Sequence, residues 1–136
     1  MIQSDIKKIV EDLIETFLDA GKISLDLREK GLTKEIKSDN TPVSNGDLEV
    51  NKILIKRISE LTPNIPIVSE ETSENKSRDN LENFWLIDPI DGTYDYINNL
   101  DEFTINAGLI IQKKPAAGLI YAPAKNRMFY SYGDDL

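Results

Sequence analysis

The chain has 136 residues, of which 24 are acidic and 16 are basic, so its formal charge is −8, and 40% of its residues are hydrophobic. This length is typical of one domain, and the negative charge argues against nucleic acid polymers and anionic membrane surfaces as partners. Cysteine and histidine are both absent, which excludes disulfides, thiolate metal sites and histidine-based catalysis.

The first half of the chain is expected to form two helices. Apolar residues recur at helical spacing over residues 4–27, and Gly31 is a suitable residue to end this helix. A second helix is predicted over residues 44–61. Asp47 lies in its first turn, where an acidic side chain interacts favourably with the helix dipole.

The remainder of the chain is expected to form short strands. Strands are predicted at 32–37, 65–68, 84–87, 103–111, 116–122 and 128–132, with a short helix at 93–99, a loop at 38–42 and an exposed charged loop at 70–82. Turn residues separate the last three strands, which favours an antiparallel meander. We therefore predict an α+β fold in which two N-terminal helices pack on a mostly antiparallel sheet.

The sequence contains no signal for a membrane. No apolar run approaches the ~20 residues that a membrane helix needs, and the first residues lack the basic and apolar regions of a signal peptide. We expect a cytoplasmic protein without a membrane span.

Carboxylates gather at the ends of the predicted apolar segments. They are Asp47 at the start of the second helix, Glu70 and Glu71 after one strand, and Asp88 and Asp91 after another. Carboxylates held close together repel one another, and one of them would have to keep its proton unless a cation neutralises the group. Because Mg²⁺ prefers oxygen ligands and usually keeps water beside one or two carboxylates, these residues indicate a hard-metal site.

The spacing of Asp88 and Asp91 is informative, because residues three apart on a regular strand face opposite sides. Pro89 is expected to force the chain out of the strand. A turn there would bring both carboxylates and the carbonyl of Ile90 to one point. Gly92 then allows positive φ or close backbone approach, and the free N–H groups of a helix start can bind phosphate. Acidic metal ligands that lead directly into an anion site suggest phosphoryl transfer to water.

Simpler interpretations of the same residues exist. A single aspartate at a strand end is usually a turn residue or a helix cap, and a Glu-Glu pair in a charged loop is usually solvated surface. An EF-hand loop that begins at Asp88 fails, because Ile90 and Asn99 occupy positions that need oxygen ligands. Phosphatases that use an aspartyl-phosphate carry Asp-x-Asp, which also does not fit.

Three segments together resemble the inositol monophosphatase superfamily of Mg²⁺-dependent, lithium-sensitive phosphatases. They are residues 37–47 (KSDNTPVSNGD), 68–71 (VSEE) and 85–93 (WLIDPIDGT). Residues 38–42, 101–106 and 118–123 are most similar to the branch of bacterial 3′(2′),5′-bisphosphate nucleotidases. Tyr94 and Asp95 depart from the Lys-Glu of that branch, which leaves an inositol monophosphatase-type substrate open.

The resemblance assigns a role to each matching residue. It implies that Mg²⁺ is bound by Glu70, Asp88, Asp91 and the carbonyl of Ile90, and that Glu71 supports a second or third ion through water. It also implies that Asp47 and Thr93 orient and help to deprotonate the attacking water. The N–H groups of Gly92 and Thr93 would hold the phosphate. Lys37 lies where the family has a lysine near this loop. The substrate would be a small phosphorylated molecule, hydrolysed without a covalent enzyme intermediate.

The resemblance also implies that residues 1–136 are the N-terminal metal- and phosphate-binding domain, and that a C-terminal domain is lacking. Family members are about twice as long, and their second domain supplies a further aspartate and most of the contacts to the organic part of the substrate. We therefore expect this chain to hold metal weakly and to hydrolyse little or nothing alone. A complementing C-terminal half or a homo-oligomer is expected as partner. The alternative is a non-catalytic metal-binding or oligomerisation module.

Overall fold

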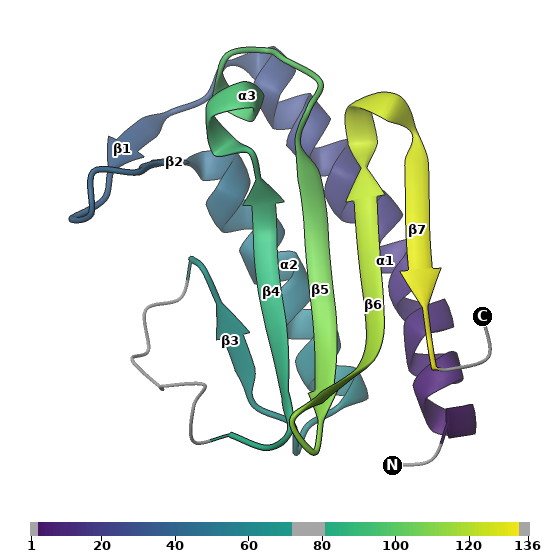
Figure 1. Cartoon of the computed structure of the whole chain (residues 1–136). Coiled ribbons are helices and arrows are strands. Elements are labelled where there is room, and N and C mark those ends of the chain that lie inside the picture. The colour runs from purple at the N-terminus through teal and green to yellow at the C-terminus, as the bar shows by residue number, and fades with distance from the viewer. Residues whose placement is uncertain (1–2, 72–80, 134–136) are drawn as a thin grey trace.

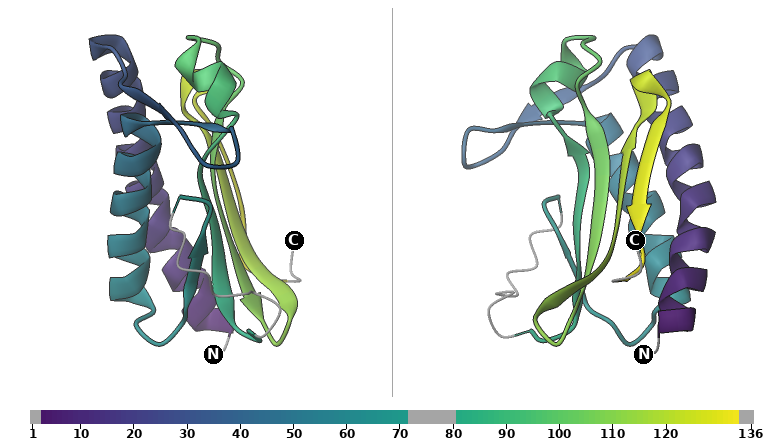
Figure 2. Two further views of the ribbon diagram at one scale, coloured as in Figure 1. Left: turned by 90° about the vertical axis from the view of Figure 1, so that its left-hand side faces the viewer. Right: turned by 45° about the vertical axis from the view of Figure 1, so that its right-hand side comes forward.

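The computed structural model describes residues 3–71 and 81–133, and it shows two layers. Helices α1 (Gln3–Lys30) and α2 (Asn45–Leu61) lie side by side on one face of a sheet (Figures 1 and 2). Both helices were predicted from the helical spacing of their apolar residues, and both are confirmed. The predicted 70–82 loop lies largely outside the described residues. No helix in the described part of the chain has the length and apolar character that crossing a membrane requires.

The main sheet has five strands in the order β3-β4-β5-β6-β7. They are β3 (Ile67–Ser69), β4 (Phe84–Asp91), β5 (Thr104–Ile111), β6 (Lys114–Ala122) and β7 (Arg127–Ser131). Strand β3 runs parallel to β4, and the other neighbours are antiparallel. The predicted α+β fold with a mostly antiparallel sheet is therefore confirmed.

Three smaller elements complete the described fold. Strands β1 (Lys34–Ile36) and β2 (Pro42–Ser44) form an antiparallel hairpin, of which only β1 was predicted. A short helix, α3 (Thr93–Ile97), follows β4, and the 3-10 helix η2 (Pro123–Lys125) joins β6 to β7. The hairpin and α3 lie at the end of the sheet where β4 finishes (Figure 1).

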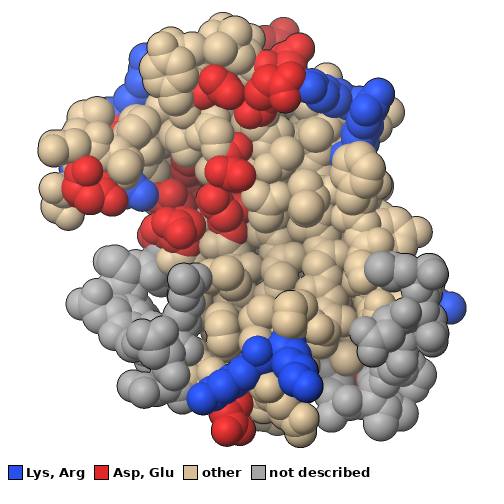
Figure 3. Space-filling model, viewed as in Figure 1, with Lys and Arg blue, Asp and Glu red and all other residues tan. Residues whose placement is uncertain are grey.

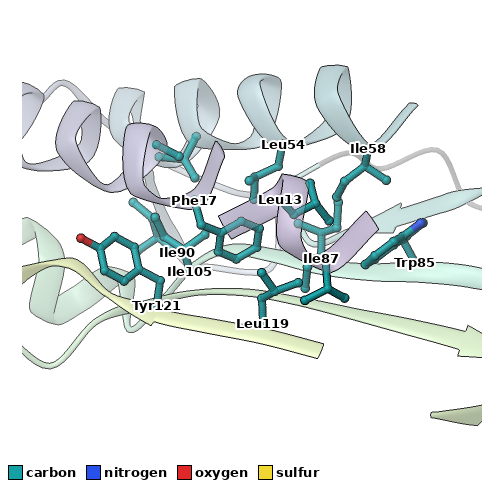
Figure 4. Close-up of a cluster of buried hydrophobic side chains, with 14 of the residues drawn as sticks. Leu13, Phe17, Leu54, Ile58, Trp85, Ile87, Ile90, Ile105, Leu119 and Tyr121 are labelled. Carbon is teal, nitrogen blue, oxygen red and sulfur yellow. The ribbon is translucent and has the colours of Figure 1, made fainter. Parts of the chain in front are cut away.

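The core lies between the helices and the sheet (Figure 4). Buried side chains come from α1 (Leu13, Phe17), α2 (Leu54, Ile58) and the sheet (Trp85, Ile87, Ile105, Leu119). The indole N–H of Trp85 donates a hydrogen bond of 3.0 Å to the hydroxyl of Thr62, just after α2. This bond satisfies the indole N–H, the one polar group of the Trp85 side chain. Burying that N–H without a partner would be costly.

The other face of the sheet, here called the outer face, carries no element of the described chain. This face holds a depression of about 620 Å³, whose lining residues include Leu86, Asp88, Asp91, Thr104, Asn106, Gly108, Ile110, Gly118, Ile120, Phe129 and Ser131. Figure 3 shows an uncharged centre, bordered by acidic side chains on one side. Asn106 Oδ1 is buried without a hydrogen-bond partner in the described structure.

Strand β4 corrects one prediction. Pro89 was expected to end the strand after Ile87, but β4 continues to Asp91. Asp88 is opposite Asn106 on β5, and Asp91 is opposite Thr104, so β4 has one more residue than β5 between these pairs. Pro89 falls within this β-bulge, where a ladder hydrogen bond is already missing and a proline is tolerated.

Candidate metal and phosphate site

The bulge in β4 decides where the two aspartates point. In a regular strand Asp88 and Asp91 would face opposite sides, but one inserted residue returns Asp91 to the side of Asp88. Both residues accordingly line the same pocket near the end of the strand, together with Ile90 and Gly92. The two aspartates therefore share a pocket because of a bulge, and not because the strand ends at Pro89. That both carboxylates and the Ile90 carbonyl meet at one point stays a prediction.

The parallel pairing of β3 with β4 adds Glu70 and Glu71 to this pocket. Parallel strands finish at the same edge of a sheet, so the residues that follow β3 lie beside the end of β4. The amide of Glu70 donates a 3.1 Å hydrogen bond to the carbonyl of Ile87. Lys37 lies 3.5 Å from Glu71, whose side chain is only 5% exposed. The burial of Glu71 raises the pKa of its carboxyl, while the neighbouring Lys37 lowers it.

Asp47 and Thr93 meet behind the pocket. Ser44 is the N-cap of α2 and forms a capping box with Asp47, whose Oδ2 accepts a 2.9 Å hydrogen bond from the Ser44 amide. The other carboxylate oxygen, Oδ1, lies 2.8 Å from the hydroxyl of Thr93. Thr93 Oγ1 also lies 3.2 Å from the carbonyl of Ile90. Because Asp47 is fully buried, it reaches the pocket only through Thr93.

Gly92 joins β4 to α3 in a conformation that favours glycine. Its φ is 88°, and a Cβ added there would lie 2.7 Å from the backbone oxygen of Glu102. The residue was predicted for positive φ or close approach, and both features are present. No side chain caps the start of α3 at this position.

The pocket that these residues form has a volume of about 330 Å³. Its lining residues are Lys37, Asp39, Thr41, Pro42, Glu70, Glu71, Asp88, Ile90, Asp91, Gly92, Thr93 and Tyr94. Of the predicted site residues, only Asp47 is not among them. Figure 3 shows acidic side chains gathered beside the outer face, on the side where β4 ends.

The electrostatic effect of this gathering appears at Asp88. The pKa of its carboxyl is raised from 3.8 to about 6, first by partial burial and then by repulsion from Asp91, Glu70, Glu71 and Asp47. A carboxylate that is both desolvated and surrounded by like charge gains from a nearby cation.

The donors in the pocket fit a hard cation such as Mg²⁺. They are carboxylates and the Ile90 carbonyl, all oxygen, with no soft ligand among them. Within residues 3–71 and 81–133, however, no group of three or more acidic side chains stands in an arrangement that would hold one ion in common. The assignment of Glu70, Asp88, Ile90 and Asp91 as ligands therefore stays a prediction.

Comparison with known proteins identifies the family of the chain. The model of the inositol monophosphatase family matches residues 5–134. The chain belongs to the inositol monophosphatase family.

Curated relatives in this family carry the name 3′(2′),5′-bisphosphate nucleotidase CysQ. The protein of Haemophilus influenzae is 37% identical over 117 residues, which cover 85% of this chain and 44% of that protein. The protein of Buchnera aphidicola is 34% identical over 132 residues, which cover 95% of this chain and 50% of that protein. The chain thus spans about half the length of the curated relatives it matches.

Solved structures of the family share the fold. CysQ from Bacteroides thetaiotaomicron superposes with a TM-score of 0.73 at 28% identity, covering 98% of this chain and 48% of that one. The Thermotoga maritima IMPase superposes with a TM-score of 0.79 at 24% identity, covering 90% of this chain and 47% of that one. The second similarity, at this identity, concerns the fold alone.

In this member of the inositol monophosphatase family, two residues that support the site, Ser69 and Asn51, were not predicted from the sequence. The hydroxyl of Ser69 lies within hydrogen-bond distance of Asn51 Oδ1 on α2, and the amide of Glu71 donates to the same hydroxyl at 3.3 Å. This chain of bonds ties the acidic turn after β3 to α2. Ser69 and Asn51 are 18 residues apart, so no local pattern connects them. The only available signal was that a serine directly precedes the Glu-Glu pair.

Proposed function

We propose that the chain is the N-terminal metal- and phosphate-binding domain of a Mg²⁺-dependent phosphomonoesterase. The reaction would be removal of the 3′-phosphate from 3′-phosphoadenosine 5′-phosphate. The observation that carries the proposal is one pocket lined by Glu70, Asp88 and Asp91, with the buried Asp47–Thr93 pair directly behind it. Family membership and the names of the curated relatives support the reaction class.

In this proposal the acidic residues hold the cation. Asp88, Asp91 and Glu70 would be its carboxylate ligands, the carbonyl of Ile90 would add a fourth oxygen, and Glu71 would act through water on a further ion. When bound, Mg²⁺ lowers the pKa of water and offsets negative charge on phosphate oxygens.

Asp47 and Thr93 would handle the proton of the attacking water. The Thr93 hydroxyl directs its hydrogen at Asp47, so its oxygen remains able to accept a hydrogen bond from water in the pocket. As the water oxygen bonds to phosphorus, a water proton passes to the Thr93 oxygen, and the Thr93 proton passes to Asp47. The ester P–O bond breaks at the same time, and the ester oxygen leaves with the electron pair of that bond and takes a proton from solvent water. The burial of Asp47 keeps this acceptor away from bulk solvent.

Gly92 and Thr93 would hold the phosphate through their backbone N–H groups. A glycine has no side chain to hinder close approach of an anion to its backbone N–H. These N–H groups stand next to the carboxylates that would bind the metal, so phosphate and cation would share the pocket.

The metal site is tested by isothermal titration of the 136-residue chain with Mg²⁺. We expect saturable binding in the wild type and at least a tenfold loss of affinity in an Asp88→Asn, Asp91→Asn double variant. A matched control is Glu15→Gln with Asp19→Asn, which removes the same charge from exposed positions on α1. Equal binding by all three proteins would reject the metal site and, with it, the enzymatic proposal.

The reaction is tested by phosphate release with Mg²⁺. We expect little or no turnover of 3′-phosphoadenosine 5′-phosphate by this chain alone, because the chain spans about half of its relatives. Turnover equal to that of a relative of full length would contradict this expectation. Tyr94 lines the pocket and is 70% exposed. An inositol phosphate is a second candidate substrate, because Tyr94 departs from the residue of the nucleotidase branch. Tighter Mg²⁺-dependent binding of inositol 1-phosphate than of the nucleotide would favour it.

A further inference from the structure

Helix α3 carries Thr93 but has only five residues. A helix of this length is not stable in isolation, so contacts outside the helix must hold it in place. Its N-terminal residue reaches α2 through the Thr93–Asp47 bond. Further contacts come from its last turn, and they reach α1, the start of α2 and Phe103. Figure 1 shows α3 at the end of the sheet where β4 finishes.

Tyr96 is the one buried residue of α3, and it connects three elements. Its hydroxyl donates a 2.6 Å hydrogen bond to the carbonyl of Ser24 on α1. Its ring packs against Phe103, with 4.9 Å between ring centroids, and fits over Gly46, where an added Cβ would lie 2.1 Å from the tyrosine oxygen. Since Gly46 directly precedes Asp47, the tyrosine seats α3 against the start of α2.

Arg28 on α1 holds the other end of α3. Its guanidinium donates a 2.6 Å hydrogen bond to the carbonyl of Leu100 and contacts the carbonyl of Tyr96 at 3.5 Å. The same group lies 5.7 Å from the Tyr96 ring centroid and pairs with Asp101 at 3.6 Å. The arginine side chain is only 11% exposed. A planar group with several donors can make these contacts together, whereas a lysine cannot.

Thr93 and Tyr96 are three residues apart and therefore lie on neighbouring positions of one helical face. From this arrangement we infer that Arg28 and Tyr96 are positioning residues, which fix α3 so that Thr93 meets Asp47 beside the metal and phosphate pocket. The inference deepens the proposed function and rests on it. Neither residue lines the pocket, so both act through α3.

The experiment uses the whole 136-residue chain and two measurements. Amide hydrogen exchange is followed at Tyr96, Asn98 and Leu100, whose N–H groups bond to carbonyls of the α3 segment, and at Leu109 in β5 as a reference for global opening. Mg²⁺ affinity is measured by titration calorimetry. The variants are Arg28→Met, Arg28→Lys and Tyr96→Phe, with Arg127→Met and Tyr130→Phe as controls at exposed positions on β7.

We expect Arg28→Met to exchange about tenfold faster at the α3 amides than the wild type, relative to the change at Leu109, because a buried charged donor is lost. Mg²⁺ affinity should fall several-fold in Arg28→Met and Tyr96→Phe, because the proposed ligand Asp91 lies two residues before the start of α3. Arg28→Lys should recover only part of either effect, and the controls should match the wild type.

Two results would overturn the inference. One is equal acceleration at the α3 amides and at Leu109, which would mean that Arg28 serves overall stability only. The other is faster α3 exchange with unchanged Mg²⁺ affinity. A wild type that binds no Mg²⁺ would instead reject the proposed function, and the exchange data would still report whether Arg28 and Tyr96 hold α3.

Discussion

Asp88 is the residue at which the fold and the proposed chemistry oppose each other. Its carboxyl has a pKa of about 6 in the folded protein, against an ordinary 3.8, so folding favours the protonated form. The contribution of Asp88 to stability is therefore fully present below about pH 4 and is lost as the pH rises through 6. At neutral pH the charged carboxylate weakens the fold.

The first prediction follows from that sign. Asp88→Asn stays neutral, so it should raise the free energy of unfolding near neutral pH by about 1 kcal/mol, a figure reduced for the solvent screening of a half-exposed group. Near pH 4 the two proteins should have similar stability. Urea unfolding, followed by the fluorescence of Trp85, measures both values. The same difference at both pH values would show that charge is not its cause.

A second prediction concerns the cation and the same carboxyl. A metal ligand must be deprotonated, so bound Mg²⁺ competes with the proton on Asp88. With a pKa of about 6, Mg²⁺ affinity should fall roughly tenfold between about pH 7.5 and pH 5. Titration calorimetry at both pH values tests this. An affinity that does not change with pH would remove Asp88 from the ligand set.

At the scale of the element, Gly92 constrains the junction between β4 and α3. Gly92→Ala would place a Cβ at positive φ and 2.7 Å from the Glu102 oxygen, so we expect a loss of about 2 kcal/mol in the free energy of unfolding. The matched control is Gly108→Ala on β5, where a Cβ meets nothing within 4 Å. That variant should stay within about 0.5 kcal/mol of the wild type. Equal unfolding midpoints in urea would contradict the strain at Gly92.

The elements differ in how far the sequence predicts them. Helices α1 and α2 follow from the spacing of their apolar residues, because each buries one stripe against the sheet. The continuation of β4 to Asp91 was missed, because a proline normally ends a strand and a bulge is not visible in the local pattern. Strand β2 was missed because its three residues pair with β1 and have little periodicity of their own.

At the scale of the whole molecule, the sequence predicts which residues form the site but not how the fold brings them together. The acidic residues could be identified because they stand at the ends of apolar segments. The parallel pairing that brings Glu70 beside Asp88 joins segments far apart in the chain, and so do the bonds of Asn51 and Arg28. Contacts of this kind depend on tertiary packing, which local propensity does not encode.

The fourth prediction belongs to the outer face. Ile120 and Phe129 are 48% and 59% exposed there, beside other apolar side chains that no described element covers. An apolar patch of this kind favours association, so the chain should self-associate as its concentration rises. Sedimentation of an Ile120→Ser, Phe129→Ser variant should show less association. Leu18→Ser with Leu48→Ser, at exposed positions on the helices, is the control, and equal association of both variants would locate the contact elsewhere.

Asp47 divides its two oxygens between two tasks: Oδ2 caps α2 and Oδ1 receives Thr93. Natural selection for folding and for catalysis would therefore act on the same side chain. In a survey of all substitutions scored by cell growth, position 47 should tolerate few replacements whether or not the protein is an enzyme. Intolerance of substitutions at position 47 is therefore expected from the role in folding alone. Asp88 differs, because its charge weakens the fold, so this residue would be retained only for a function.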